Sequence, residues 1–178
     1  MQVIRMKNEI MQRIAASVSS FRLPRYNEIP NVGLYLEQTA KFISEYYAPL
    51  GDHGLTTSMI SNYVKKGLVD NPVKKQYNRE QIAYLLFIAL AKNVLSLDAL
   101  SNFIQIQKQT YPLEIAYNYF CDQLEEILRY TFELSDTISA ADTDSRDEKR
   151  LLYSCVVAMT QNIYLEKCLE AVVEEKNK

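Results

Sequence analysis

Apolar residues recur every three or four positions along most of the chain, which is the spacing of helices that bury one face. Over residues 32–47 the repeated positions are Leu36, Ala40, Ile43 and Tyr47. This stripe predicts a first long helix whose remaining faces are polar and meet solvent.

A turn and a short second helix are predicted next. Gly51 and Gly54 end the first helix, because closely spaced glycines favour turns. Thr56 is placed to cap a helix that begins at Thr57, since its hydroxyl can accept a bond from a free backbone N–H. Gly67 can take the left-handed conformation that commonly follows a helix end.

Residues 68–77 are too short and too interrupted by proline for a helix, and they predict a tight two-stranded wing. Asn78 can cap a third helix over residues 79–93, with Gln81 completing a pattern like a capping box. The third helix is apolar on several sides, so we expect it to be central. Its predicted buried stripe comprises Ile82, Leu85, Leu86, Ala89 and Leu90. A short helix is predicted over residues 98–107.

Two longer helices are predicted after Thr110, over residues 112–136 and 146–175, joined by the polar loop 139–145. Each carries an apolar seam of alternating three- and four-residue spacing, which is typical of helical hairpins and coiled coils. The first seam is Leu113, Tyr117, Phe120, Leu124, Ile127, Thr131 and Leu134. The second seam is Leu151, Cys155, Ala158, Leu165, Leu169 and Val172. Packing within one chain and pairing of two chains both remain open.

The N-terminal segment predicts an amphipathic helix followed by a linker at residues 22–30 that contains two prolines. The apolar face of this helix is Val3, Met6, Ile10, Ile14 and Val18. The predicted fold is therefore all-α with a small β wing. Three regions are expected: the N-terminal helix and linker at 1–30, a winged helix-turn-helix at 31–109, and a C-terminal hairpin at 110–178.

Charge is distributed unevenly over the 178 residues, although the net charge is only −2. Residues 1–109 carry 13 Lys and Arg against 8 Asp and Glu, a net charge of +5. Residues 110–178 carry 7 against 14, a net charge of −7. Because phosphate binding depends on the local patch, the first half can meet nucleic acid. The acidic half should face solvent or another protein.

Enzymatic signatures such as GxGxxG, the P-loop, GxSxG, HExxH and CxxC are missing from the sequence. His53 is the single histidine, which excludes a histidine triad or a multi-histidine metal site within one chain, and we expect it to be a plain turn residue. Cys121, Cys155 and Cys168 lie far apart and are expected to be reduced and buried. The prediction is a cytoplasmic, non-enzymatic protein without cofactor, metal or membrane span.

The candidate chemistry lies between Thr56 and Arg79, where five basic residues stand against Asp70 alone. Ser58, Ser61 and Asn62 are small and polar, as a helix in the major groove of DNA requires. On this spacing alone, DNA binding and a generic helical interaction domain remain equally open.

A family resemblance favours DNA binding over the interaction domain. The segment SMISNYVKKGLV resembles the recognition-helix segment of MerR-type regulators, NPVKKQYNREQI resembles their wing and third-helix start, and LSLDAL resembles the turn into their fourth helix. The block from VGLYLEQTAKFISEYYAPLG to KKQYNREQIAYLLFI also resembles the YkrK-like bacterial proteins of unknown function. The MerR resemblance implies Tyr63 and Lys65 at the phosphate backbone, with Ser58, Ser61 and Asn62 at base edges.

The same resemblance implies that Lys74 and Lys75 contact DNA from the wing, while Tyr77 braces the wing against the helix. The expected DNA-contact set is Thr57, Ser58, Ser61, Asn62, Tyr63, Lys65, Lys66, Lys74, Lys75 and Arg79. These residues predict a sequence-specific, homodimeric transcription regulator that binds double-stranded DNA.

The alternative is a non-enzymatic protein-interaction module that uses the winged-helix fold and the acidic hairpin. Thirteen tyrosines favour this reading, since tyrosine is common at interfaces. An interface or the pocket of an unknown small-molecule effector could be lined by Tyr46, Tyr47, Tyr111, Tyr117, Tyr119 and Tyr130.

Overall fold

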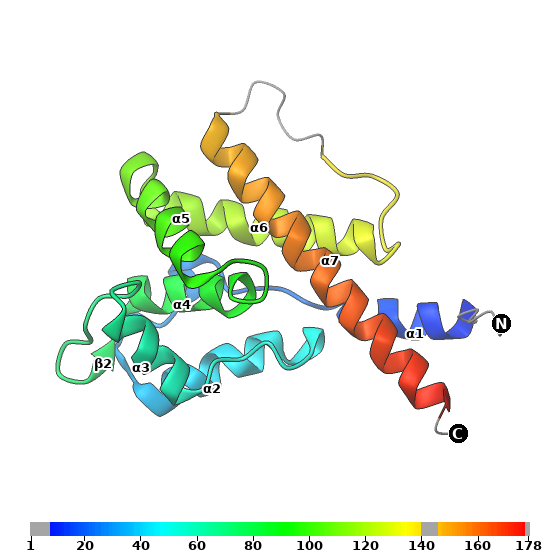
Figure 1. Ribbon diagram of the computed structural model, residues 1–178, viewed down its shortest axis with the longest axis horizontal. Coiled ribbons are helices and arrows are strands. Elements are labelled where there is room, and N and C mark those ends of the chain that lie inside the picture. Colours follow the sequence, from blue (N-terminus) through cyan, green and yellow to red (C-terminus); the bar gives the residue numbers. More distant parts are fainter. Residues whose placement is uncertain (1–7, 140–145, 177–178) are drawn as a thin grey trace.

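The computed structural model describes residues 8–139 and 146–176, and these residues are largely helical with one small sheet (Figure 1). The helices are α1 (Asn8–Val18), α2 (Leu36–Tyr47), α3 (Thr57–Lys65), α4 (Arg79–Ala91), α5 (Leu97–Thr110), α6 (Leu113–Thr131) and α7 (Asp147–Lys176). The 3-10 turns are η1 (Tyr26–Glu28) and η2 (Ala48–Leu50), and the strands are β1 (Leu34–Tyr35) and β2 (Gln76–Tyr77). The predicted mostly helical class with a small β element is confirmed.

Helix α4 is the centre of the fold, as its apolar composition predicts. Ten of its thirteen residues are buried, and it packs against α2, α6 and α7. The predicted cap is present, because the Asn78 side chain accepts from Gln81 N–H while the Gln81 side chain accepts from Asn78 N–H. The buried hydroxyl of Tyr47 donates to the carbonyl of Leu86 over 2.6 Å, which ties α2 to this central helix.

The wing differs from the prediction in its strand partner. Residues 34 and 35 are extended and pair antiparallel with β2, with Leu34 opposite Tyr77. Helix α2 therefore begins at Leu36, and the predicted start at residue 32 is wrong. The predicted two-stranded unit within 68–77 is reduced to a single bridge between Val73 and Gln76. The second strand comes from ahead of α2, so the pairing is between distant segments.

Helix α1 buries Ile10, Ile14 and Val18, which confirms the amphipathic prediction for these three positions. They pack toward η2 and α7. Val3 and Met6, the other two residues of the predicted face, lie outside the described residues.

The linker packs on α6 through an ion pair. Arg25 donates to both carboxylate oxygens of Glu125 over 2.7 and 2.8 Å and to Asp122 over 2.9 Å. The Leu23 N–H also donates to Glu125 over 2.9 Å. Charge-assisted, two-pronged bonds of this kind are the strong ones, and the pair raises the pKa of Arg25.

Glu125→Ala is expected to lower the free energy of unfolding by about 2 kcal/mol, because it leaves the half-buried Arg25 guanidinium and the Leu23 N–H without this partner. The exposed Asp122, at 62% side-chain exposure, is the matched control, and Asp122→Ala should cost less than about 1 kcal/mol. Denaturant unfolding measures both. Equal losses in the two variants would contradict the proposed anchoring role of Glu125.

The predicted C-terminal hairpin is present, since α6 and α7 pack together more extensively than any other pair of elements. The first seam is confirmed at its centre, where Tyr117, Phe120, Leu124 and Ile127 are buried. All of the predicted loop 139–145 except Ser139 lies outside the described residues.

The second seam is wrong as the packing surface of the hairpin. Leu151, Leu165 and Leu169 are 47%, 56% and 57% exposed, and Ala158 is exposed as well. Cys155 is the one member of the predicted seam that is buried. It forms the buried side of α7 together with Val156, Met159, Thr160, Ile163 and Ala171. Helix α7 runs obliquely across α6 and also contacts α1, α4 and α5, so several helices decide which side is buried (Figure 1).

A continuous hydrophobic core joins α1, the linker, α2 to α5 and the hairpin. The core crosses both predicted region boundaries, because Leu23 and Ile29 of the linker and Tyr117 of α6 belong to it. Among the described helices, none is long and apolar enough to cross a membrane.

Candidate nucleic-acid interface

Helix α3 begins and ends at the predicted cap residues, and two buried side chains pack it against the core. The Thr56 hydroxyl accepts from the Met59 N–H over 3.2 Å, and Gly67 follows the helix with φ +76°. Ile60 and Tyr63 anchor its inner side, at 0% and 8% exposure. These contacts fix which side of α3 faces outward.

The outward side of α3 is polar. Ser58, Ser61, Asn62 and Lys65 are all exposed and follow the i, i+3, i+4, i+7 spacing of one helix face. Lys66, at the C-cap, is also exposed. Predicted base-contacting and phosphate-contacting residues are therefore brought to one surface.

Tyr63 does not share this surface. Its side chain is only 8% exposed and belongs to the hydrophobic core, and burial raises the pKa of its hydroxyl. The predicted place of Tyr63 at the phosphate backbone is therefore replaced by a packing role. Tyr63 follows Ile60 by three residues, so both side chains lie on the inward face of α3. The resemblance to MerR-type proteins implied an outward position instead.

The turn that carries Lys74 and Lys75 is a two-residue hairpin. Val73 and Gln76 exchange backbone hydrogen bonds of 3.2 and 2.9 Å, and both lysines have positive φ values of 51° and 65°. Such turns usually contain Asn and Gly, because side chains with a Cβ are strained there. The strained conformation presents both lysines at the exposed tip of the wing.

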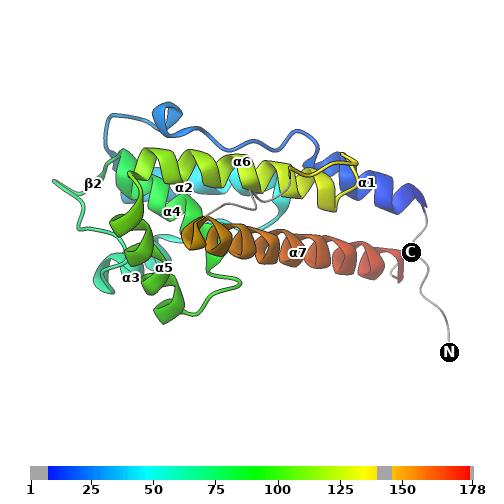
Figure 2. The same ribbon diagram turned by 90° about the horizontal axis from the view of Figure 1, so that it is seen from above.

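Helix α3 and this hairpin turn lie at the same end of the molecule, away from the C-terminal end of α7 (Figure 2). The two views agree on this placement. The predicted recognition helix and the predicted wing therefore share one end of the molecule.

The Arg79 side chain binds the linker instead of joining the exposed surface of α3. Its Nε donates to the Ile29 carbonyl over 2.9 Å, its Nη1 donates to Asn27 over 3.3 Å, and its guanidinium stacks over the Tyr26 ring at 5.6 Å. These contacts join the linker to the start of α4, so the predicted DNA contact of Arg79 is replaced by a structural one. Thr57 is half-buried in the first turn of α3.

Two exposed residues of the wing, Tyr35 and Val73, were not among the predicted contacts. Tyr35 is 52% exposed in β1, and Val73 is 71% exposed beside the lysine turn. A strand of two residues carries no periodic signal of its own, so Tyr35 was assigned to the predicted helix 32–47. The exposure of Tyr35 beside β2 makes it a candidate contact, and this exposure is visible only in the structure.

The connection between α2 and α3 is tightly packed. Gly54 approaches Ser44 of α2 so closely that a Cβ at this position would collide with it. His53 is 2% exposed, with Nδ1 3.2 Å from Asn93 Nδ2 and Nε2 3.4 Å from a carboxylate oxygen of Glu166. The prediction of a plain turn residue is wrong, because this histidine joins the turn to the end of α4 and to α7.

Acidification is expected to weaken the fold through His53. Burial lowers its pKa, opposed in part by the carboxylate of Glu166 and aided by Lys92 and Lys167. Because the unfolded chain binds the proton more tightly, the stability contributed by neutral His53 is present above about pH 6.5 and is lost as the pH falls further.

Comparison of wild type with His53→Gln in denaturant unfolding between about pH 5 and pH 8 isolates this effect. The free energy of unfolding of wild type should fall more steeply with acid than that of the variant. Parallel curves for the two proteins would show that His53 does not titrate as described.

The remaining reactive side chains within residues 8–139 and 146–176 are dispersed carboxylates and cysteines. No group of three or more His, Cys, Asp or Glu in these ranges could hold a metal ion. Burial raises the pKa of Cys121 to about 12 and that of Cys155 to about 11, so both thiols stay protonated at neutral pH. Cys168 is half-buried rather than buried as expected.

Comparison with known proteins gives one family match. The sequence model of a family described as a domain of unknown function (DUF1836) matches residues 24–120. The match runs from the linker through α2 to α5 and into α6, so it contains α3, the wing and α4. No curated protein and no solved structure matches the chain.

Proposed function

Since the chain belongs to this DUF1836 family, whose function is unknown, we propose that it binds double-stranded DNA sequence-specifically and regulates transcription as a homodimer. The observation that carries the proposal is that the exposed polar face of α3 and the exposed lysine turn of the wing belong to elements at the same end of the molecule. The resemblance of residues 56–100 to MerR-type winged helix-turn-helix proteins supports the same conclusion.

In this proposal α3 enters the major groove. Small polar side chains allow close approach of the helix, and Ser58, Ser61 and Asn62 can exchange hydrogen bonds with base edges. Lys65 and Lys66, at the end of the helix, would contact phosphates and fix its register. Neutral contacts read the bases and charged contacts supply most of the affinity.

The wing adds phosphate contacts from the side. Lys74 and Lys75 form the exposed tip, and Tyr35 lies on the adjoining strand with an exposed hydroxyl-bearing ring. A hydroxyl and two ammonium groups are suitable partners for phosphate oxygens. The C-terminal half of α7, with its acidic residues, runs away from this end of the molecule (Figure 1).

The exposed apolar side of α7 supports the homodimer. Leu151, Ala158, Leu165, Leu169 and Val173 form a stripe along one face of this helix, which we call the α7 stripe. The residues interspersed with it, Ser154, Gln161 and Asn162, carry no charge, while the exposed Glu166 and Glu170 flank it. A two-fold interface uses the same patch on both subunits, and the α7 stripe can serve as that patch.

Leu165→Glu combined with Leu169→Glu should convert the dimer to a monomer, because four carboxylates would then meet across the two-fold axis. Light scattering coupled to size-exclusion chromatography gives the mass. The matched control is Glu170→Gln with Glu175→Gln, which changes charge at exposed positions of α7 outside the stripe and should leave the dimer intact. A monomeric wild type would contradict the proposed interface.

Selection of bound sequences from random duplex DNA by the purified protein tests the proposed function. We expect a palindromic consensus with half-sites about one helical turn apart, since each subunit contributes one α3. Failure to enrich any sequence, together with stoichiometric capture of a single protein, would favour an interaction module instead.

A further inference from the structure

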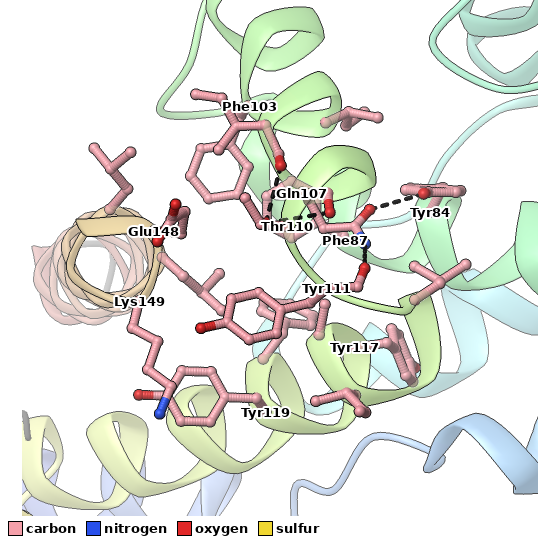
Figure 3. Close-up of a pocket in the computed structure, with 18 of the residues that line it drawn as sticks. Tyr84, Phe87, Phe103, Gln107, Thr110, Tyr111, Tyr117, Tyr119, Glu148 and Lys149 are labelled. Atoms are coloured by element: carbon pink, nitrogen blue, oxygen red, sulfur yellow. Dashed lines mark hydrogen bonds between the residues drawn. The ribbon is translucent and has the colours of Figure 1, made fainter. Parts of the chain in front are cut away.

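A pocket of about 280 Å³ lies between α4, α5, the first half of α6 and the start of α7, and none of the proposed DNA contacts lines it (Figure 3). Its size is near the lower end of small-molecule sites, which span about 300–1,000 Å³. Of the six tyrosines predicted to line an interface or an effector pocket, Tyr111, Tyr117 and Tyr119 line this one. Tyr46, Tyr47 and Tyr130 do not, and Tyr47 is fully buried in the core.

Aromatic rings form most of the wall. Phe87 stacks on Phe103 with ring centroids 5.3 Å apart and meets Phe120 edge to face at 5.2 Å. In Figure 3, Phe103, Tyr111 and Tyr119 face the start of α7 across the hollow. Aromatic walls in offset and edge-to-face arrangements favour another flat ring as the occupant.

Three of the polar side chains that line the pocket, Tyr84, Gln107 and Thr110, already have partners within the chain. The Tyr84 hydroxyl donates to Gln107 Oε1 over 2.7 Å, Gln107 Nε2 donates to the Tyr111 carbonyl over 2.9 Å, and the Thr110 hydroxyl donates to the Ile106 carbonyl over 2.9 Å. An ionic ligand placed against these three side chains would lose its hydration without gaining a free partner from them.

The charged residues of the wall come from the first turns of α7. Glu148 and Lys149 carry opposite charges, and the Lys149 ammonium already lies 5.5 Å from the centre of the Tyr119 ring. Their opposite signs leave no net charge on this side of the pocket. The chemistry of the wall therefore selects a neutral ligand.

The rim of the pocket is apolar and open to solvent. Ile106, Ile115 and Leu151 line it and are 38%, 58% and 47% exposed. Exposed apolar side chains grouped around a concave site mark a place where an apolar partner is removed from water. A ligand larger than the hollow itself could continue onto these three side chains.

We propose that this pocket binds a neutral, flat aromatic small molecule of about two fused rings. The site is separate from the proposed DNA interface, so it stands whether or not the chain binds DNA. A bound molecule would contact α4 and α5 on one side and α6 and α7 on the other, and would add to the packing between these helices.

The probe is N-phenyl-1-naphthylamine, a neutral aromatic dye whose fluorescence rises in apolar surroundings, titrated into the full-length protein. We expect saturable binding with one site per chain. Ala116→Phe places a ring in the pocket and should weaken binding at least tenfold. The matched control, Ala16→Phe on the exposed side of α1, should bind the dye as wild type does.

A sulfonated analogue, 1-anilinonaphthalene-8-sulfonate, tests the neutral part of the proposal. It should bind several-fold more weakly than the uncharged dye, because the sulfonate gains no free cation inside. Equal or tighter binding of the sulfonate would overturn the assignment to a neutral ligand.

Intermolecular NOEs locate the dye without any variant, which keeps the test valid if Ala116→Phe fails to fold. The proposal expects contacts from the dye ring to the methyl groups of Ile104 and Leu152, both of which line the pocket. Contacts to Leu165 and Leu169 on the α7 stripe would place the dye on the outer surface and overturn it. Loss of dye affinity as protein concentration and dimer content rise would identify a second copy as the occupant instead.

Discussion

Alanine at both Lys65 and Lys74 is expected to weaken binding to duplex DNA by between about tenfold and a hundredfold at an ionic strength near 0.1 M. Each lost lysine–phosphate contact should lower the slope of log K against log salt by about 0.9. Both side chains are exposed, one at the end of α3 and one at the wing tip, so the fold should be unaffected. Fluorescence anisotropy across a salt series measures affinity and slope together.

The matched control is Arg129→Ala combined with Arg150→Ala, which removes two exposed cations from α6 and α7. This variant has the same net charge as the lysine double variant, and its affinity and slope should stay close to those of wild type. An equal loss in both double variants would indicate binding through overall charge. Unchanged affinity in the lysine variant would contradict the placement of α3 and the wing on DNA.

A variant of the lysine turn distinguishes an effect on DNA affinity from an effect on the stability of the fold. Lys74→Asn with Lys75→Gly removes the wing charges and supplies the residues that positive φ values favour. The fold should gain about 1 kcal/mol from relief of the left-handed strain while the DNA affinity falls. A concurrent loss of stability would show that the lysines also hold the hairpin together.

Leu86→Ala is expected to lower the free energy of unfolding by about 3–4 kcal/mol. Leu86 is 0% exposed in the middle of α4, which packs against helices on several sides. Close packing around it prevents collapse of the cavity that the truncation leaves. Denaturant unfolding followed by far-UV circular dichroism measures the loss.

Truncation of an exposed apolar residue is the comparison for Leu86→Ala. Val32 is 75% exposed before β1, and Val32→Ala should change stability by less than about 0.5 kcal/mol. A loss below about 1 kcal/mol for Leu86→Ala would mean that α4 is not the densely packed centre described above.

Local signals predicted the helices around the candidate interface well. Thr56, Asn78 and Gln81 occupy the predicted cap positions, and Gly67 follows α3 as expected. Caps and turns depend on residues within a few positions of one another, so a sequence contains their full cause. The exposed face of α3 followed from the same local spacing.

Features that depend on distant partners could not be predicted. The strand that pairs with β2 comes from Leu34 and Tyr35, some 40 residues earlier in the chain. Arg79 is held by the linker, and His53 is buried against Glu166 of α7. In each case the deciding contact is made by an element whose position the local sequence does not specify.

The buried face of α7 could not be predicted from the sequence either. A seam such as Leu151, Leu165 and Leu169 predicts that some partner covers it, but it does not say which one. Within the described chain the other side of α7 packs on α6, and the seam remains exposed. Periodicity therefore indicated an apolar surface correctly and assigned it to the wrong neighbour.

Amide chemical-shift changes in the ¹⁵N-labelled protein on addition of duplex DNA test the DNA-binding claim most directly, because they report each backbone position separately. The account predicts changes concentrated in residues 57–66 and 73–76, with α6 and the C-terminal half of α7 unaffected. Changes confined to α6 and α7, or no changes with any selected duplex, would contradict it.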